Sequence, residues 1–323
     1  MKKWLFGILL MLAICYLGFT YYLSELIVHG PPRRDLPTAY KLLKEDWDID
    51  RDSILHLLPT PEDVDFTGVS LDGSSQPGIT LKGWFFPSDS AQAPCAVVMA
   101  HGISDNRSGM FKYANAYRSC HCAILMYDHR AHYQSGPDDY VTGGILESED
   151  LKAAHRFLAQ KTGLPDEKIG WVGESWGGAA VLIAGGSDEI RPAFIHADSP
   201  YSDWYTAINE RAVKMFGNWI SLFFHGTFTW ANFKLGIDYR DASPQRAAAN
   251  IQVPTIILHS AADVETSPDQ SQKIFDHLAH PEKSELHLLE WGSWHAQSAA
   301  RRPAEYYQIV QAFLAEQVPD FCE

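Results

Sequence analysis

The chain has 323 residues, 46% of them hydrophobic, and a formal net charge of −14 at pH 7. This length is enough for one large hydrophobic core or two smaller ones. The acidic balance argues against nucleic acid as a partner, because phosphate binding needs a cationic face.

The segment from Trp4 to Leu23 carries no charged residue over 20 positions. A helix of that length extends about 30 Å, the thickness of a bilayer hydrocarbon core. We therefore interpret residues 4–23 as a retained transmembrane anchor with Trp4, Tyr21 and Tyr22 at its interfaces. A cleaved signal peptide is the alternative, although its apolar region is usually about 7–15 residues long and ends in a small-x-small site that this sequence lacks.

Lysines precede the span and arginines follow it, and we expect the N-terminus inside and the globular body on the extracytoplasmic side. The chain would then be a single-pass membrane protein in an oxidising compartment, where its five cysteines matter. Buried free thiols are the alternative interpretation of Cys95, Cys120 and Cys122. With no C-x-x-C pair, no metal site is expected.

Residues 24–60 resemble a polar connector, with the helix-breaking cluster HGPPRRDLP. A globular domain is expected over residues 64–320. It begins with VDFTGVSL and ITLKGWFF, two alternating runs around the turn residues DGSSQPG, which predict an antiparallel strand pair.

Six further runs are short, continuously apolar and rich in branched residues: CAVVMAHG, CAILMYDH, KIGWVGES, AFIHADSP, VPTIILHS and ELHLLEW. Strands that are apolar on both faces belong to a parallel sheet covered by helices. Helical stripes at 148–160 and 304–317 lie between or after these runs. The alternation predicts an α/β fold with a mostly parallel central sheet.

Residues 201–250 interrupt this alternation. They are rich in aromatic residues, namely Tyr201, Trp204, Tyr205, Phe216, Trp219, Phe223, Phe224, Phe228, Trp230, Phe233 and Tyr239. Disordered loops are poor in aromatics, so we expect a small helical cap. Its aromatics either line a substrate site or simply pack the cap on the core.

The stretch GESWGG places Ser175 between a predicted strand and a predicted helix. A sharp strand–helix turn of the G-x-S-x-G type presents a strained nucleophile at the carboxyl edge of a sheet. Gly173 and Gly177 are expected where side chains would collide. The alternative is a glycine-rich packing turn with an inert serine.

A nucleophilic serine needs a base, and the base needs an orienting acid, in the chain order Ser, acid, His. Asp263 and His295 each follow a late predicted strand, so both should lie at the edge that carries Ser175. Weaker candidates are Asp198 and Glu265 for the acid and His287 for the base. Two backbone N–H groups, of Ile103 and Trp176, are the candidate oxyanion donors.

These residues together resemble the α/β-hydrolase superfamily from about residue 64 onward, through AHGISDNR, YDHRAHYQSG, GESWGG, SAADVETSP and GSWHAQS. YDHRAHYQSG is similar to a segment of monoacylglycerol-lipase and serine-aminopeptidase members, but Tyr133 and Gln134 stand around the expected glycine. The resemblance implies a hydrolase that needs no cofactor. It also implies that the strands beginning near Cys95 and near Cys120 and Cys122 are neighbours, which makes a disulfide there a hypothesis.

The prediction is a membrane-anchored serine hydrolase that cleaves a small or lipid-like carboxylic ester through Ser175, Asp263 and His295. A serine peptidase is the first alternative; it would need an acidic residue for a free amine, for which Glu174, Glu210 and Asp203 are unassigned candidates. A non-catalytic, membrane-tethered binding module is the second alternative.

Overall fold

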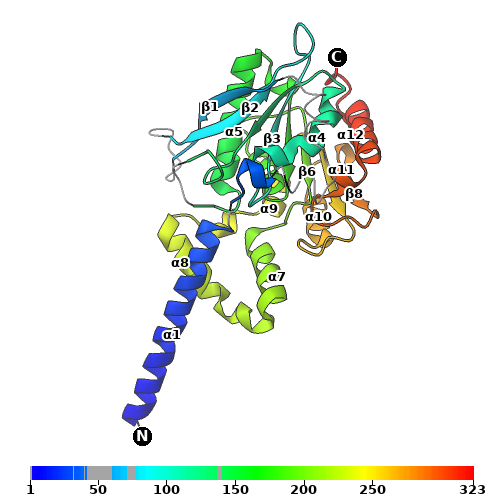
Figure 1. Cartoon of the computed structure of the whole chain (residues 1–323). Coiled ribbons are helices and arrows are strands. Elements are labelled where there is room, and N and C mark those ends of the chain that lie inside the picture. The colour runs from blue at the N-terminus through cyan, green and yellow to red at the C-terminus, as the bar shows by residue number, and fades with distance from the viewer. Residues whose placement is uncertain (1, 32, 40, 42–59, 71–77, 137–139) are drawn as a thin grey trace.

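A computed structural model describes residues 2–31, 33–39, 41, 60–70, 78–136 and 140–323. The turn predicted at 72–78 lies almost entirely outside these residues, as does the part of the predicted connector from 42 to 59. Within the described residues, eight strands form one sheet in the order β1-β2-β4-β3-β5-β6-β7-β8 (Figure 1).

The sheet is antiparallel at one edge and parallel elsewhere. β1 (Glu62–Thr67) pairs with β2 (Thr80–Phe86), and β2 pairs with β4 (Ala123–Tyr127), both antiparallel. The parallel part continues through strands that each match a predicted apolar run: β3 (Ala96–Ala100), β5 (Ile169–Glu174), β6 (Ile195–Asp198), β7 (Thr255–Ser260) and β8 (Glu285–Leu289). The predicted α/β-hydrolase fold class is therefore confirmed.

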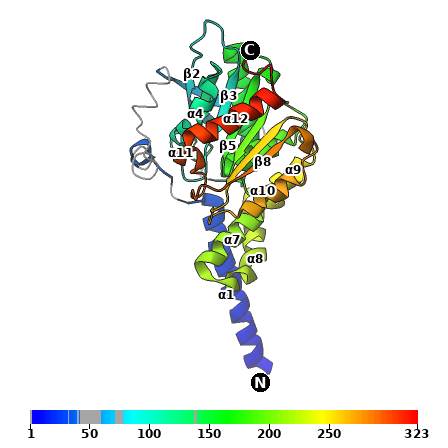
Figure 2. The same cartoon turned by 90° about the vertical axis from the view of Figure 1, so that its right-hand side faces the viewer.

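Helices cover both faces of the sheet, as the strand composition requires. Val97 and Met99 of β3 face the side of α4 (Phe111–Arg118) and α12 (Pro303–Gln317), with α11 (Ser298–Arg301) beside α12 (Figure 2). Alternate residues of the same strand face the opposite side, which carries α5 (Ile145–Thr162), α6 (Trp176–Gly185), α9 (Pro244–Ala248) and α10 (Pro268–Phe275). Parallel strands buried on both faces place their carboxyl ends, and the loops that follow, at one edge.

The segment between β6 and β7 is helical, as predicted. It contains α7 (Trp204–Phe216), a 3-10 segment η3 (Asn218–Phe223), α8 (Phe224–Leu235) and a 3-10 turn η4 (Tyr239–Asp241) before α9. We call α7, η3 and α8 the cap. In Figures 1 and 2 the cap projects from the body on the same side as α1 (Lys2–His29).

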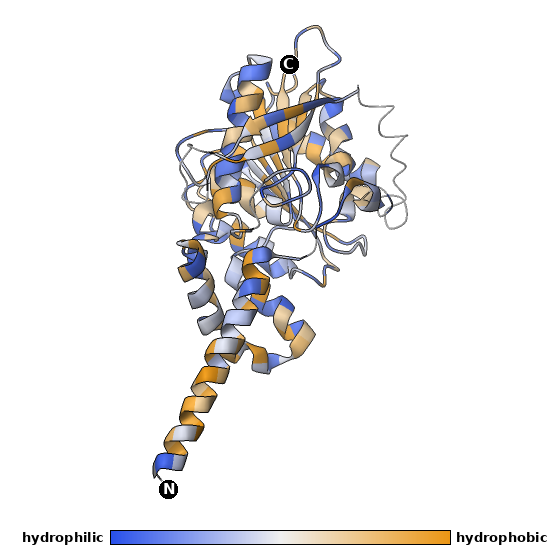
Figure 3. Cartoon of the chain, turned by 60° about the vertical axis from the view of Figure 1, so that its left-hand side comes forward, coloured by the Kyte–Doolittle hydropathy of each residue, from blue (hydrophilic) through white to orange (hydrophobic). Residues whose placement is uncertain are grey.

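Helix α1 is longer than the predicted anchor and includes the first six residues of the predicted connector, 24–29. Its N-terminal half is apolar and extends away from the body (Figure 3). Its other end is built into the protein, where Ile27 and Val28 are buried with Trp176, Tyr201 and Phe224 in one apolar cluster. The helix is long and apolar enough to cross a membrane.

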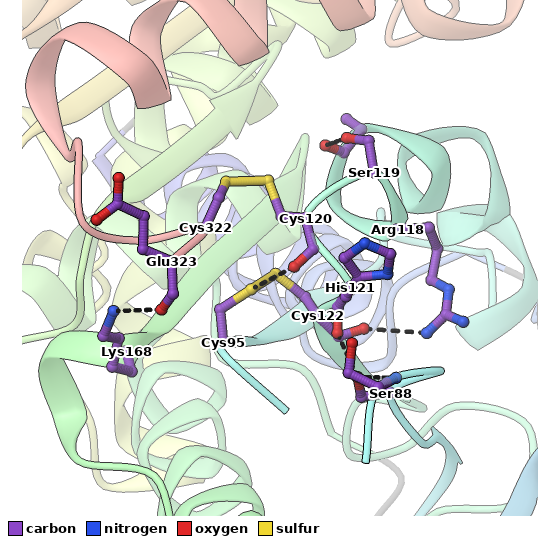
Figure 4. Close-up of a disulfide and its surroundings, with 12 residues drawn as sticks. Ser88, Cys95, Arg118, Ser119, Cys120, His121, Cys122, Lys168, Cys322 and Glu323 are labelled. Atoms are coloured by element: carbon purple, nitrogen blue, oxygen red, sulfur yellow. Dashed lines mark hydrogen bonds between the residues drawn. A yellow bond between two sulfur atoms is a disulfide. The ribbon is translucent and has the colours of Figure 1, made fainter. Parts of the chain in front are cut away.

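Two disulfides lie close together near the C-terminus (Figure 4). Cys95 is bonded to Cys122, and this bond is the disulfide hypothesised between the starts of β3 and β4. Cys120 is bonded to Cys322, which fixes the C-terminal tail beside β4. Cys15 in α1 is the free cysteine.

Candidate active site

Ser175 occupies a sharp turn between β5 and α6. Its backbone has φ of 51° and ψ of −110°, a conformation rare for a residue with a side chain. The turn depends on its glycines, since a Cβ on Gly173 would lie 2.3 Å from the carbonyl oxygen of Gly177, and one on Gly177 would lie 2.1 Å from that of Ala100. No side chain fits at either position, so the predicted reason for both glycines is confirmed.

The three residues predicted from chain order come together at this turn. Nε2 of His295 lies 2.7 Å from Oγ of Ser175, and Nδ1 of His295 lies 2.6 Å from Oδ2 of Asp263. The carboxylate cannot donate, so Nδ1 carries the proton and Nε2 is free to accept one from the serine hydroxyl. This is the arrangement that a general base and its orienting acid require.

Asp263 is held as a carboxylate although its side chain is buried. Its Oδ1 accepts hydrogen bonds from the backbone N–H groups of Glu265 and Thr266. Burial raises its pKa, but hydrogen bonds from His259 and His295 outweigh that effect and the net pKa is lowered. The same pairing raises the pKa of His295 above its usual value, against the lowering effect of burial.

His259 is a contributor that the sequence analysis missed. Its Nε2 lies 3.0 Å from Oδ2 of Asp263 and 3.1 Å from the carbonyl oxygen of Thr266, both of which only accept, so Nε2 is protonated. Its Nδ1 lies 2.7 Å from the Ser271 hydroxyl, which donates to it. His259 lies within strand β7, and its position four residues before Asp263 is the signal in the sequence that points to it.

The rival candidates are engaged elsewhere. The Asp198 carboxylate accepts from the hydroxyls of Tyr113, Tyr306 and Ser199, and Ser199 Oγ in turn accepts from the backbone N–H of Ala296. Asp198 therefore supports the loop after His295 rather than orienting the imidazole. The other rivals pair at their own sites, Glu265 with Arg211 and His287 with Glu285.

The loop that carries the predicted oxyanion donor Ile103 lies against the nucleophile. A Cβ on Gly102 would be 3.6 Å from Cβ of Ser175. His101 shapes this loop as a neutral imidazole, with Nδ1 donating to the Gly102 carbonyl and Nε2 accepting from the His129 N–H. Burial lowers the pKa of His101 to about 4. Trp176, the other predicted donor, is the first residue of α6, where backbone N–H groups have no helical partner.

A buried ion pair lies directly beside Ser175. Nζ of Lys112 on α4 is 2.7 Å from Oε2 of Glu174, and both side chains are almost fully shielded from solvent. Burial raises the pKa of Glu174 more than Lys112 lowers it. The other acidic residues considered for an amine are also engaged, since Asp203 caps α7 and Glu210 accepts from Gln270.

Two exposed apolar residues are sequence neighbours of Asp263 and His295. Val264, next to Asp263, is 66% exposed, and Trp294, next to His295, is 70% exposed. Isolated exposed hydrophobic residues are ordinary, but these two flank the reacting groups. They give the rim of the site an apolar character.

Comparison of the sequence with known protein families identifies the family of this chain. The sequence model of the prolyl oligopeptidase family matches residues 140–320, a range that includes Ser175, Asp263 and His295. The chain belongs to the prolyl oligopeptidase family. It is thus a serine hydrolase of the α/β-hydrolase type, as the resemblance implied.

Similar proteins extend the match beyond that range. The uncharacterized protein YqkD of Bacillus subtilis is 29% identical over 244 residues, covering 73% of this chain and 76% of its own. Among solved structures, the Pyrococcus furiosus esterase Pf2001 has a TM-score of 0.64 at 21% identity, covering 88% of this chain and 98% of that one. The acylaminoacyl peptidase of Pyrococcus horikoshii has a TM-score of 0.62 at 18% identity, covering 83% and 44% respectively. The structural likenesses concern the fold alone.

Proposed function

We propose that this protein is a membrane-anchored carboxylesterase with Ser175 as nucleophile, His295 as general base and Asp263 as orienting acid. The observation that carries the proposal is the continuous hydrogen-bond chain from Oγ of Ser175 through both ring nitrogens of His295 to Oδ2 of Asp263. A positioned base of this kind activates a hydroxyl that has no intrinsic reactivity.

The proposed reaction proceeds through an acyl-enzyme. Nε2 of His295 takes the proton of Ser175 as Oγ attacks the ester carbonyl carbon, and the carbonyl oxygen becomes an oxyanion. The backbone N–H groups of Ile103 and Trp176 stabilise that charge; losing one such donor typically costs about 3 kcal/mol. His295 then protonates the leaving alcohol. In the second half-reaction His295 takes a proton from water, the water attacks the acyl-enzyme, and the proton returns to Ser175 as the acid is released.

Ester substrates with an apolar part fit the surroundings best. Val264 and Trp294 give the rim an apolar character, and Trp176 and Ile103 pack with the aromatic residues of the cap. No free acidic side chain is offered to a substrate amine among the three considered, because Glu174, Asp203 and Glu210 each bind another group.

A peptidase is the second candidate, and the family match favours it. The family is named for an oligopeptidase, and one structural neighbour is an acylaminoacyl peptidase, whose name describes a substrate with a blocked amine. An acylated peptide needs no acidic partner. The proposal of an esterase therefore rests on the apolar rim rather than on excluding amide substrates.

The anchor and its orientation are part of the proposal. Residues 4–23 span the bilayer, and the body lies on the extracytoplasmic side. The disulfides Cys95–Cys122 and Cys120–Cys322 support an oxidising compartment, since such bonds are rare in the cytosol.

The deciding experiment compares p-nitrophenyl esters of increasing acyl length with aminoacyl and N-acylaminoacyl anilides, using the full chain in detergent. The esterase predicts higher kcat/KM for the esters, rising with acyl length. Higher kcat/KM for the N-acylaminoacyl anilides would replace it with the peptidase. If neither class is turned over by folded protein, the non-catalytic binding module takes its place.

A further inference from the structure

Helix α8 of the cap and the apolar helix α1 run side by side in the same direction. The ring of Tyr16 stacks on Phe223 at 5.4 Å, and Tyr21 meets Trp230 edge-to-face at 5.7 Å. Further along both helices, Lys234 binds Glu25 at 2.7 Å. The residue numbers of the contacts rise together in both segments, so α8 lies parallel to residues 16–25 of α1 (Figures 1 and 2).

Both helices change from uncharged to charged at the same level. The cap carries no Asp, Glu, Lys or Arg between Lys214 and Lys234, and α1 carries none between Lys3 and Glu25. Toward the globular body, the first charges that end these stretches, Glu25 and Lys234, form an ion pair with each other. Lys214, at the other end of the cap stretch, extends to the globular body and donates to the carbonyl oxygen of Val264. A shared boundary of this kind is expected where a hydrocarbon layer ends, because charged groups are costly inside it.

The length of α1 places this boundary one bilayer thickness from Trp4. Trp4 to Ser24 are 21 residues, about 31 Å of helix, which matches a hydrocarbon core of about 30 Å. The ring contacts with the cap begin at Tyr16, and Trp4 to Cys15 amount to only about 18 Å. The part of α1 that extends beyond the cap is therefore too short to span a bilayer by itself.

The cap presents apolar side chains at that depth. Met215, Phe216, Trp219, Leu222 and Phe233 are between 50% and 81% exposed. Residues of this kind gathered at one end of a soluble domain indicate a surface that binds something apolar. Since the same depth along α1 is assigned to the hydrocarbon core, the partner that fits is lipid acyl chain.

We propose that the end of the cap, residues 215–233, is immersed in the hydrocarbon of the leaflet nearest the globular body. The immersed depth runs from Tyr16 to Ser24 along α1, about 13 Å. Phe224 and Phe228 of the cap belong to the same buried apolar cluster as Trp176, and Ile103 packs against that cluster. The cap thus extends from the candidate site into the bilayer, and the substrate class of the site is an ester that partitions into the membrane. This inference rests on the proposed anchor and on the proposed esterase.

The test measures depth and does not depend on activity. In a Cys15→Ser background with both disulfides intact, a cysteine is introduced by Leu222→Cys in the cap and labelled with a nitrobenzoxadiazole fluorophore. Leu9→Cys in α1 is the positive control, and Leu288→Cys, exposed on β8 of the body, is the matched negative control. Each protein is reconstituted in phosphatidylcholine vesicles, with quenching by doxyl-labelled phosphatidylcholine and by aqueous iodide.

The proposal predicts that the label at 222 shifts to the blue and is quenched by doxyl lipid like the label at 9, while iodide quenches only the label at 288. Quenching of the label at 222 by iodide overturns it, and so does protection from both quenchers, which would indicate a second copy or another protein on the cap. If the label at 9 is also aqueous, the anchor fails as well. Fluorophosphonate labelling of the same variants reports separately on Ser175, so a failure of the esterase proposal is distinguished from a failure of the cap proposal.

Discussion

Nε2 of His259 lies 3.0 Å from Oδ2 of Asp263, the oxygen that His295 also binds. The acid of the candidate site is therefore held by two imidazoles, one that faces Ser175 and one that is buried behind it. Because His259 donates its only ring proton, it fixes the carboxylate while His295 remains the base.

His259→Phe removes that donor and tests its role as a positioning residue. A hydrogen bond to a charged group contributes about 1.5–3 kcal/mol, so we expect the free energy of unfolding to fall by about 2 kcal/mol. The carboxylate becomes more basic, and the acid limb of the kcat/KM profile moves to higher pH. The measurements are urea unfolding and the pH profile.

The matched control is His287→Phe, on the neighbouring strand β8, where the imidazole binds Glu285 instead. It should leave the pH profile unchanged. A profile that shifts equally in both variants would remove His259 from the site.

The pH dependence of activity follows from the pKa of His295. The base must be neutral, and Asp263 raises the pKa of His295 above its usual 6.5. Activity should therefore fall as pH decreases through a value above 6.5, the ordinary pKa of an imidazole. Asp263→Asn removes the charge that raises this pKa and should move the remaining acid limb downward. An acid limb well below pH 6 in the unsubstituted enzyme would contradict this assignment.

The buried pair of Lys112 and Glu174 should be needed for stability. Lys112→Met leaves a carboxylate buried without its cation, which typically costs 3–5 kcal/mol, and urea unfolding measures the loss. The double variant Lys112→Met with Glu174→Gln should recover much of it. As the control, Glu305→Gln breaks an exposed pair with Arg302 and should cost about 1 kcal/mol or less. Equal costs for the two single variants would show that the buried pair has no special role.

The disulfides predict a thiol count. Thiol titration of denatured, unreduced protein should find one free thiol, Cys15, of the five cysteines. Cys322→Ser opens the bond to Cys120, which closes a long loop, and should lower the free energy of unfolding by about 2–5 kcal/mol. Cys15→Ser is the control and should leave stability unchanged. A count of five thiols would place the body in a reducing compartment.

The sequence predicted what local pattern determines. Continuous apolar runs identified each parallel strand, including β8, which is only partly buried at the edge of the sheet. The strand–glycine–serine–helix order located the turn at Ser175, because its glycines are a local steric requirement. Asp263 and His295 followed from chain order, since parallel strands end at one edge. The positions of these residues are set by the order and direction of the strands, which the sequence pattern predicts.

The rest depends on contacts between distant segments. Nothing local to Cys322 indicates that it meets Cys120, 202 residues earlier, and Lys112 and Glu174 meet only when α4 packs beside β5. The packing of α8 on α1 has the same origin. The uncharged run predicted a helix over residues 4–23 and the aromatic content of 201–250 predicted a helical cap, but neither pattern contains information on how the two segments pair.

Fluorophosphonate labelling of the full chain tests the central claim most directly. The unsubstituted protein should be labelled stoichiometrically at Ser175, Ser175→Ala should not be labelled, and His295→Ala should react far more slowly because the hydroxyl has lost its base. As the control, Ser187→Ala removes a hydroxyl beyond the C-terminal end of α6 and should label at the normal stoichiometry. Stoichiometric labelling of folded Ser175→Ala protein would contradict the assignment of the nucleophile.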